Sequence, residues 1–285
     1  MDKSTFFSYM PFPECKGKIL SRERPLVMGI LNVTPDSFYD KGKSYALADA
    51  IRQTERMLEE GADIIDIGAI STRPGAPDVN ADEESKRLEP VLKAVTGRFP
   101  EAVLSIDTYR SEIARRAIEA GCDIINDISG GRFDPAIFDV ARSLDVPYIL
   151  MHMQGTPQDM QSNPQYDDVI EEIRTFFEAQ IAGLKNESYN KIVLDPGFGF
   201  GKNVDHNFII LKHLHEFKKL GYPVLAGISR KSMINKLLGT NPQSALNGTT
   251  VANTLALLNG ADILRVHDVK EAVQAVKMVE KYLEV

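Results

Sequence analysis

Two side chains suited to binding an anion lie close together near the C-terminus. Arg265 and His267 are two residues apart, at the end of the apolar run DILRV that begins at Asp262. Alternate residues of an extended strand point to the same side, so both side chains can reach one ligand. Together they are suited to a diphosphate or a carboxylate, whereas a lone His is more often a surface or capping residue.

Comparable polar groups end or follow seven other apolar runs. In chain order they are Asn32, segment 71–73, Asp107, Asn126, His152, Asp195 and segment 229–231. Any one of them could simply start a loop, but eight runs that end alike indicate groups gathered at one edge of a sheet. Lys231 could also act as a Schiff-base lysine, although no neighbouring motif requires carbonyl chemistry. No Cys, Ser–His or Lys arrangement typical of covalent catalysis is evident, so no covalent nucleophile is expected.

A glycine-rich stretch, DPGFGFGK from Asp195 to Lys202, looks like a nucleotide-binding loop but lacks the required spacing. It is neither G-x-G-x-x-G opening a Rossmann helix nor G-x-x-x-x-G-K-[ST]. Its glycines permit unusual backbone angles beside a ligand. The stretch therefore predicts a ligand-facing loop of another kind.

Eight short apolar runs are predicted as the strands that position these groups. They are LVMGIL from Leu26, DIIDIG from Asp63, AVLSID from Ala102, DIIND from Asp123, PYILMH from Pro147, KIVLD from Lys191, PVLAGI from Pro223 and DILRV from Asp262. Runs that are apolar on both faces and alternate with helices are typical of a parallel sheet.

Helical patterns separate the runs, and a repeated phrase marks three of the boundaries. The phrases GADI at 61–64, GCDI at 121–124 and GADI at 260–263 each follow a helical pattern, so each glycine is expected to be a helix C′ cap. Leu47, Ile51 and Leu58 show the helical spacing before the first phrase. The last helix is predicted from Asp268 to Leu283, with Asp268 and Glu271 as a capping box.

Eight βα units predict an α/β fold, a single (β/α)₈ TIM barrel, with an open doubly wound sheet as the alternative. Residues 1–285 are expected to form one domain, in which 25–285 make the barrel and 1–24 an arm capping the barrel bottom. The aromatic residues of positions 1–18 could instead be disordered.

Composition narrows the class of protein. The 285 residues, 43% hydrophobic and 26% charged, fit one globular domain with a sizeable core. No apolar run approaches the roughly 18 to 20 residues of a membrane span, and the N-terminus lacks a signal-peptide pattern. A net charge of −7 argues against a nucleic-acid surface. The two cysteines, Cys15 and Cys122, form neither a disulfide framework nor a metal cluster, so a cytoplasmic location is expected.

Six blocks of the sequence together resemble the dihydropteroate synthase family. They are MGILNVTPDSF, GAISTRPGA, LMHMQGTP, DPGFGFGK, GISRKS and RVHDV, in this order from about Leu26 to the C-terminus. The resemblance implies a pterin-binding barrel. One departure is visible in the first loop, SFYDKGKSY, where Tyr39 and Lys41 stand at positions that are often small in the family.

The resemblance implies a role for each strand-end group. Asp195 would accept the amine and ring N–H donors of the pterin, while Asp107, Asn126 and Lys231 read the rest of the ring. Phe200 would form an aromatic wall beside the aminobenzoate. The further binding candidates are Thr72, Arg73, Ser229, Arg265 and His267.

By the same resemblance, the reaction joins 6-hydroxymethyl-7,8-dihydropterin diphosphate to p-aminobenzoate and releases diphosphate, as a step of folate biosynthesis. Diphosphate is expected to leave before the amine attacks, with Asp107, Lys231, Arg265 and His267 as the catalytic groups. Mg²⁺ is the implied cofactor, with Asn32 as its protein ligand. The family also implies a homodimer and competition by sulfonamides.

Two rival functions start from the same pocket. A pterin-dependent methyltransferase shares the Asp and Asn residues, but STRPG, SRKS and RVHD fit it poorly. A non-catalytic pterin-binding subunit would have lost the diphosphate-site residues, yet Asn32, Arg73, Arg265 and His267 are all present.

Overall fold

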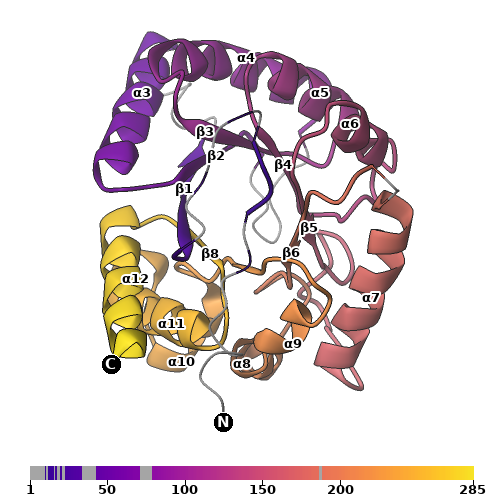
Figure 1. Cartoon of the computed structure of the whole chain (residues 1–285), viewed down its shortest axis with the longest axis vertical. Coiled ribbons are helices and arrows are strands. Elements are labelled where there is room, and N and C mark those ends of the chain that lie inside the picture. The colour runs from indigo at the N-terminus through magenta and orange to yellow at the C-terminus, as the bar shows by residue number, and fades with distance from the viewer. Residues whose placement is uncertain are drawn as a thin grey trace.

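Eight parallel strands form a barrel surrounded by helices (Figure 1). The computed structural model describes residues 10, 12–15, 17, 20, 23–33, 43–70, 79–185 and 188–285, with only the backbone described for 43–46. The strands are β1 (Leu26–Asn32), β2 (Ile64–Gly68), β3 (Val103–Asp107), β4 (Ile124–Asp127), β5 (Tyr148–Met151), β6 (Ile192–Asp195), β7 (Leu225–Ala226) and β8 (Ile263–Val266). Seven strands lie within the predicted runs, and β1 extends one residue beyond its run, to Asn32, which confirms the strand predictions.

The strand order confirms the barrel and excludes the open doubly wound sheet. The order is β6-β5-β4-β3-β2-β1-β8-β7, so the first and last strands pair with each other in the middle of the order. The ends of this order, β6 and β7, meet through a single bridge between Leu194 and Val224. The barrel is therefore closed most weakly beside β7, its shortest strand.

Helices cover the outer face of the sheet. They are α3 (Lys43–Glu59), α4 (Ala81–Arg98), α5 (Ser111–Glu119), α6 (Ile137–Ser143), α7 (Val169–Leu184), α8 (Val204–Lys212), α9 (His215–Lys218), α10 (Ser232–Leu238), α11 (Leu246–Leu258) and α12 (Val269–Glu284), with a 3₁₀ turn η1 (Pro242–Ser244). Within the described ranges, no helix is long and apolar enough to cross a bilayer.

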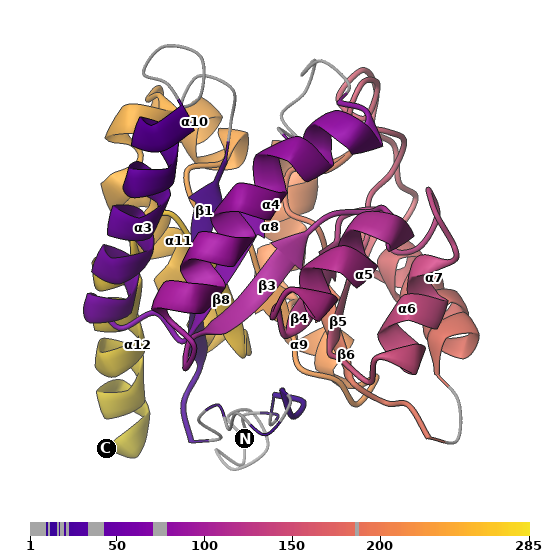
Figure 2. The ribbon, with the colours of Figure 1, turned by 90° about the horizontal axis from the view of Figure 1, so that it is seen from above.

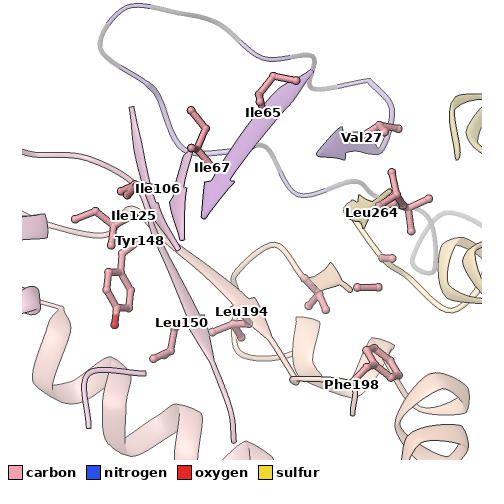
Figure 3. Close-up of a cluster of buried hydrophobic side chains, with 14 of the residues drawn as sticks. Val27, Ile65, Ile67, Ile106, Ile125, Tyr148, Leu150, Leu194, Phe198 and Leu264 are labelled. Carbon is pink, nitrogen blue, oxygen red and sulfur yellow. The ribbon is translucent and has the colours of Figure 1, made fainter. Parts of the chain in front are cut away.

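The main core lies between the sheet and this ring of helices. Outward-facing strand residues such as Val27, Ile65, Leu150 and Leu264 are buried there (Figure 3). Each buried aliphatic side chain contributes roughly 1.5 to 3 kcal/mol to folding, before the entropy cost. This core holds the strands, and therefore the residues at their ends, in a fixed relation.

The three repeated phrases end helices as expected. Gly61, Gly121 and Gly260 have φ angles of 99°, 111° and 97°, in the left-handed region that favours glycine after a helix. The aspartate two positions later ties its own strand to the preceding one. Its backbone N–H donates to a carbonyl of that strand, and its carboxylate accepts the N–H of the same residue. The pairs are Asp63 with Val27, Asp123 with Leu104 and Asp262 with Val224.

The described residues of the arm lie at the end of the barrel at which the strands begin (Figure 2). Phe12 and Cys15 are buried in a cluster with inward-facing residues of the strand starts, such as Met28 and Ile149. Met10 donates its backbone N–H to Asp262 Oδ1 at 3.0 Å. The predicted cap is confirmed for these residues, while the boundary at residues 24 and 25 stays a prediction.

The capping box predicted for the last helix is wrong. Asp268 does precede α12, but its side chain caps no backbone group. Its two oxygens accept from Nε and Nη2 of Arg230, at 2.9 and 2.5 Å. A bidentate, charge-assisted pair is stronger than a cap to a neutral N–H, so the carboxylate turns toward Arg230.

Candidate active site

Inward-facing residues of the barrel change from apolar to polar along the strands. Ile64, Val103 and Ile263 face the barrel bottom. Asp66, Asp107 and Arg265 lie further along the same strands, nearer their C-terminal ends. Strand β4 adds Asn126, whose Cα is in register with that of Asp107. The upper half of the barrel interior is therefore the polar floor of a site at the C-terminal ends of the strands.

Arg265 lies between two carboxylates in this floor. Its Nε donates to Asp66 Oδ2 at 2.6 Å, and its Nη2 donates to Asp107 Oδ2 at 2.7 Å. The pKa of Asp107 is raised to about 7. Burial is the main cause and the charge of Asp66 adds to it, while the charge of Arg265 acts against the rise. Asp107 is thus an acid that changes charge near neutral pH.

Asp66 is a site residue that the sequence interpretation missed. It is fully buried, and Oδ2 also accepts a hydrogen bond from Asn126 Nδ2 at 3.0 Å. A signal was present, since Asp66 is a charge inside the otherwise apolar strand IIDIG. Buried charges are retained only when they are paired, so an acid at that position indicates a partner inside the barrel.

Asp195 and Lys231 occupy the β6 and β7 side of the same mouth. Asp195 is buried, and its Oδ1 accepts the N–H of Gly197 at 2.7 Å. Burial raises the pKa of Asp195, and the positive charge of Lys231 acts against that rise. Burial lowers the pKa of Lys231 to about 8, while Asp195 raises it. The two predicted residues are therefore electrostatically coupled.

Phe200 stands over this cation. Lys231 Nζ lies 4.3 Å from the centroid of the Phe200 ring and donates to the carbonyl of Phe198. A cation over an aromatic face is stabilised by the quadrupole of the ring. The predicted aromatic wall is thus joined to the predicted pterin-reading lysine.

The DPGFGFGK stretch forms a tight loop that packs against His152. A Cβ at Gly197, where φ is 69°, would lie 1.9 Å from the carbonyl oxygen of His152, so only glycine fits. Lys202 Nζ lies 3.0 Å from both His152 Nδ1 and the Phe200 carbonyl. Burial lowers the pKa of His152 to about 2 and that of Lys202 well below its usual value. His152 therefore lies beneath the loop, where it contacts Lys202, and not among the groups of the polar floor.

Ser229 and His267 contact each other across β7 and β8, an arrangement that the sequence interpretation did not expect. Ser229 Oγ lies 3.0 Å from His267 Nδ1 and accepts the backbone N–H of His267 at 3.2 Å. A hydroxyl can donate to Nδ1 or accept from it, so the direction of this contact follows the tautomer of the imidazole. Arg230, at a φ of 58°, holds the two strand ends together through Asp268.

A small apolar wall lies at the C-terminal ends of β4 and β5. Ile128, Met151, Met153 and Met160 form a small buried cluster, and Tyr109 and Phe200 pack against it. The methionines supply a polarizable surface that suits a flat aromatic ring. The sequence interpretation missed this wall, because its residues look like ordinary core positions.

Of the remaining predicted residues, the structure describes only Asn32. Asn32 is exposed at the end of β1, and its Cα is in register with that of Gly68. Thr72 and Arg73 lie outside the described residues. Within the described ranges, no group of three or more His, Cys, Asp or Glu side chains could hold a metal ion. Any metal here would need oxygens supplied by a ligand.

Comparison with known proteins gives a consistent result. A model of the pterin binding enzyme family matches residues 28–267. Dihydropteroate synthase of Escherichia coli K12 is 46% identical over 270 residues, covering 94% of this chain and 95% of that protein. The crystal structure of Yersinia pestis dihydropteroate synthase with a sulfonamide drug complex superposes with a TM-score of 0.89 at 44% identity, over 96% and 99% of the two chains. Dihydropteroate synthase of Xanthomonas albilineans, in complex with 7,8-dihydropteroate, gives 0.86 at 39% identity, over 96% and 100%.

Proposed function

The chain belongs to the dihydropteroate synthases of the pterin-binding enzyme family, and from that premise we propose which residues perform each part of the reaction. The enzyme transfers the pterin-methyl group of 6-hydroxymethyl-7,8-dihydropterin diphosphate to p-aminobenzoate, giving 7,8-dihydropteroate and diphosphate. One observation carries the proposal. Acceptors and cations, including Asp107, Asn126, Asp195 and Arg265, lie at the C-terminal ends of the strands around one barrel mouth, where an apolar wall also lies.

The pterin ring lies on the polar floor in this proposal. Asp195 accepts two hydrogen bonds from the amine and ring N–H donors, because a carboxylate matches that paired edge. Asn126 and Asp107 read the rest of the ring, and Lys231 donates to its acceptors. The cluster of Ile128, Met151, Met153 and Met160 supports one face of the ring by dispersion.

The diphosphate lies toward β8. Arg265 and the Nε2–H of His267 donate to its oxygens, with Arg73 of the second loop as a further cation and Thr72 as a neighbouring hydroxyl donor. Ser229, whose Oγ lies 3.0 Å from Nδ1, orients the imidazole of His267. Phe200 forms the wall beside the aminobenzoate.

Diphosphate departs first in the proposed mechanism. The C–O bond breaks and its electron pair leaves with the diphosphate, whose growing charge Arg265 and His267 bind more tightly than the ester. The pterin-methyl cation is stabilised by its own electron-rich ring and by ionised Asp107. The amine nitrogen then donates its lone pair to form the C–N bond and loses a proton to solvent. These steps use no covalent nucleophile, because the leaving group departs before the amine attacks.

Mg²⁺ fits the residues present only as part of a metal–substrate complex. Asn32 offers a single exposed amide oxygen, and the described residues provide no carboxylate cage. Mg²⁺ commonly keeps several waters and binds substrate phosphates with few protein ligands. Asn32 would thus hold one face of a Mg²⁺–diphosphate unit, in which the metal neutralises charge on the leaving group.

A homodimer is also proposed, through the exposed apolar face of α10, α11 and α12. These neighbouring helices leave Leu237, Val251, Met278 and Tyr282 more than half exposed. Exposed large apolar side chains on neighbouring helices favour a protein interface there. A Val251→Glu variant is expected to elute as a monomer in light-scattering chromatography, whereas a parent that is itself monomeric would contradict the dimer. The cytoplasmic location, inferred from the cysteine content of the sequence, stays part of this proposal.

Diphosphate release tests the catalytic assignment. The purified protein is incubated with Mg²⁺ and pterin diphosphate, with and without p-aminobenzoate, while diphosphate and dihydropteroate are quantified. Aminobenzoate-dependent product is expected. Pterin binding without diphosphate or product would favour a methyltransferase or a binding subunit. Positional isotope exchange within the diphosphate tests the order of steps, and its absence during turnover would count against early departure.

A further inference from the structure

Asp66 is the most deeply buried acid of the site, and none of the roles assigned above requires it. One carboxylate oxygen, Oδ2, accepts from both Arg265 Nε and Asn126 Nδ2, at 2.6 and 3.0 Å. The other oxygen, Oδ1, is buried and has no hydrogen-bond partner among the described residues. Burying a carboxylate oxygen without a hydrogen-bond partner costs free energy of folding. We therefore expect Asp66 to have a functional role.

The contact with Asn126 fixes which end of the amide meets a ligand. An amide side chain has an NH₂ that donates and an oxygen that accepts, and a carboxylate can only accept. The NH₂ of Asn126 must therefore face Asp66, as the 3.0 Å contact shows. Asn126 Oδ1 is turned away from Asp66, and no described residue donates to it. Asn126 consequently offers an acceptor to the barrel mouth.

The contact with Arg265 fixes the guanidinium on two sides. Asp66 holds Nε and Asp107 holds Nη2, while Nη1 donates to no described residue. A guanidinium that is already immobilised loses little conformational entropy when an anion binds. Arg265 is thus held in place before a ligand arrives.

We infer that Asp66 is the positioning residue of this site: it makes Asn126 a reader of ring N–H donors and holds Arg265 in place for the diphosphate. The inference rests on the proposed function, because it takes the pterin and the diphosphate as the ligands of these two residues. Asp66 touches neither ligand and acts through its neighbours. Its effect is predicted to fall on pterin affinity beyond any effect on stability.

Ser105 provides a matched control. It is the β3 residue in register with Asp66, it is fully buried, and its hydroxyl has no hydrogen-bond partner among the described residues. A Ser105→Ala variant therefore changes the same layer of the barrel without removing a described contact. Differences between this variant and those at Asp66 report the hydrogen bonds of Asp66.

The test compares binding of 6-hydroxymethyl-7,8-dihydropterin by calorimetry in Asp66→Ala, Asp66→Asn, Ser105→Ala and Asn126→Ala, with the thermal midpoint of each. Asp66→Ala is expected to weaken binding ~10-fold or more, as a lost buried acceptor does. Asp66→Asn is expected to recover affinity to within ~3-fold of the parent, because its side-chain oxygen replaces Oδ2 and accepts from both donors. Ser105→Ala should bind like the parent.

A measurement on the unaltered protein covers the case in which Asp66→Ala fails to fold. The side-chain ¹⁵NH₂ resonances of Asn126, assigned by their loss in Asn126→Asp, should exchange slowly with solvent and shift little when the pterin binds. Large ligand-induced shifts would mean that the NH₂ faces the ligand, which overturns the inference.

The outcomes separate this inference from the proposed function. If Asn126→Ala binds the pterin as tightly as the parent, the pterin assignment of Asn126 is wrong, and the inference fails with it. If Asn126→Ala binds weakly while a folded Asp66→Ala binds normally, only the role of Asp66 is wrong. A folded Asp66→Asn that fails to recover affinity also overturns it, because acceptance through Oδ2 would then not be what matters.

Discussion

Asp107 gives the enzyme a predicted dependence on pH close to neutrality. Burial raises the pKa of this carboxyl to about 7, against the opposing effect of Arg265. The mechanism requires the ionised form, since only a carboxylate stabilises a pterin-methyl cation. Activity should therefore rise as pH increases through about 7 and fall below it.

The size of the effect follows from the ionised fraction. With a pKa of about 7, roughly a tenth of Asp107 is ionised at pH 6 and roughly nine tenths at pH 8, so kcat/KM, which reports the free enzyme, should change about tenfold between them. An Asp with the ordinary pKa of about 4 would be ionised at both pH values and would give no change.

The assay is kcat/KM for pterin diphosphate against pH from 5.5 to 8.5, for the parent and Asp107→Asn. The variant controls for titration of the diphosphate, which occurs in both proteins. The parent should show an inflection near pH 7 that the variant lacks. A flat parent profile, or the same inflection in both proteins, would refute the reasoning. A ¹³C titration of labelled aspartate provides the pKa independently.

The raised pKa of Asp107 also makes the free energy of unfolding depend on pH. The direction of this dependence is opposite to that for a usual salt-bridged Asp, whose pKa is lowered. The folded-state pKa exceeds the unfolded value, so the folded protein holds the proton more tightly. The stabilisation is full below about pH 4 and is lost as pH rises through about 7. Asp107→Asn should then melt higher than the parent at pH 8, and by less at pH 5.

Three further predictions concern groups around the site. Arg265→Ala should lower kcat by on the order of 10² to 10³, because it removes a preorganised charge from the leaving diphosphate, and a near-normal rate would refute its assignment. Arg230→Ala and Asp268→Ala should show a coupling free energy of about 1 kcal/mol in a double-mutant cycle of urea unfolding, since the pair is partly exposed, and additive effects would contradict it. Lys202→Met should raise the KM for p-aminobenzoate more than the KM for pterin diphosphate, because it releases the Phe200 carbonyl, and equal changes would argue against a role in the loop.

The elements of the fold could be predicted from the sequence because the determining signals are local. Strands buried on both faces appear as continuous apolar runs, and the glycines that end helices before them stand at fixed positions such as Gly61 and Gly121. Because the strands are parallel, their C-terminal ends lie together at one mouth of the barrel. This is why Asp107, Asn126, Asp195 and Arg265 could be placed together from the sequence.

The contacts among those residues could not be predicted, because they depend on register between strands. Asp66 lies two residues before the end of its strand and pairs with Arg265, which is 199 residues away. Asp268 looked like a cap because the local pattern fits one, but the partner that it takes, Arg230, is supplied by another strand end. Ser229 and His267 meet for the same reason.

Asp63, Asp123 and Asp262, which directly precede β2, β4 and β8, predict the order in which parts of the barrel fold. Their ties join residues only 36, 19 and 38 positions apart, to Val27, Leu104 and Val224. Closing a short stretch of chain costs little entropy, so each two-strand unit can assemble early and on its own. Pairing of β1 with β8 requires the whole chain and should form last. The reacting groups of β2, β3 and β8 would then come together only in that final step, so partly folded chains would lack the site altogether.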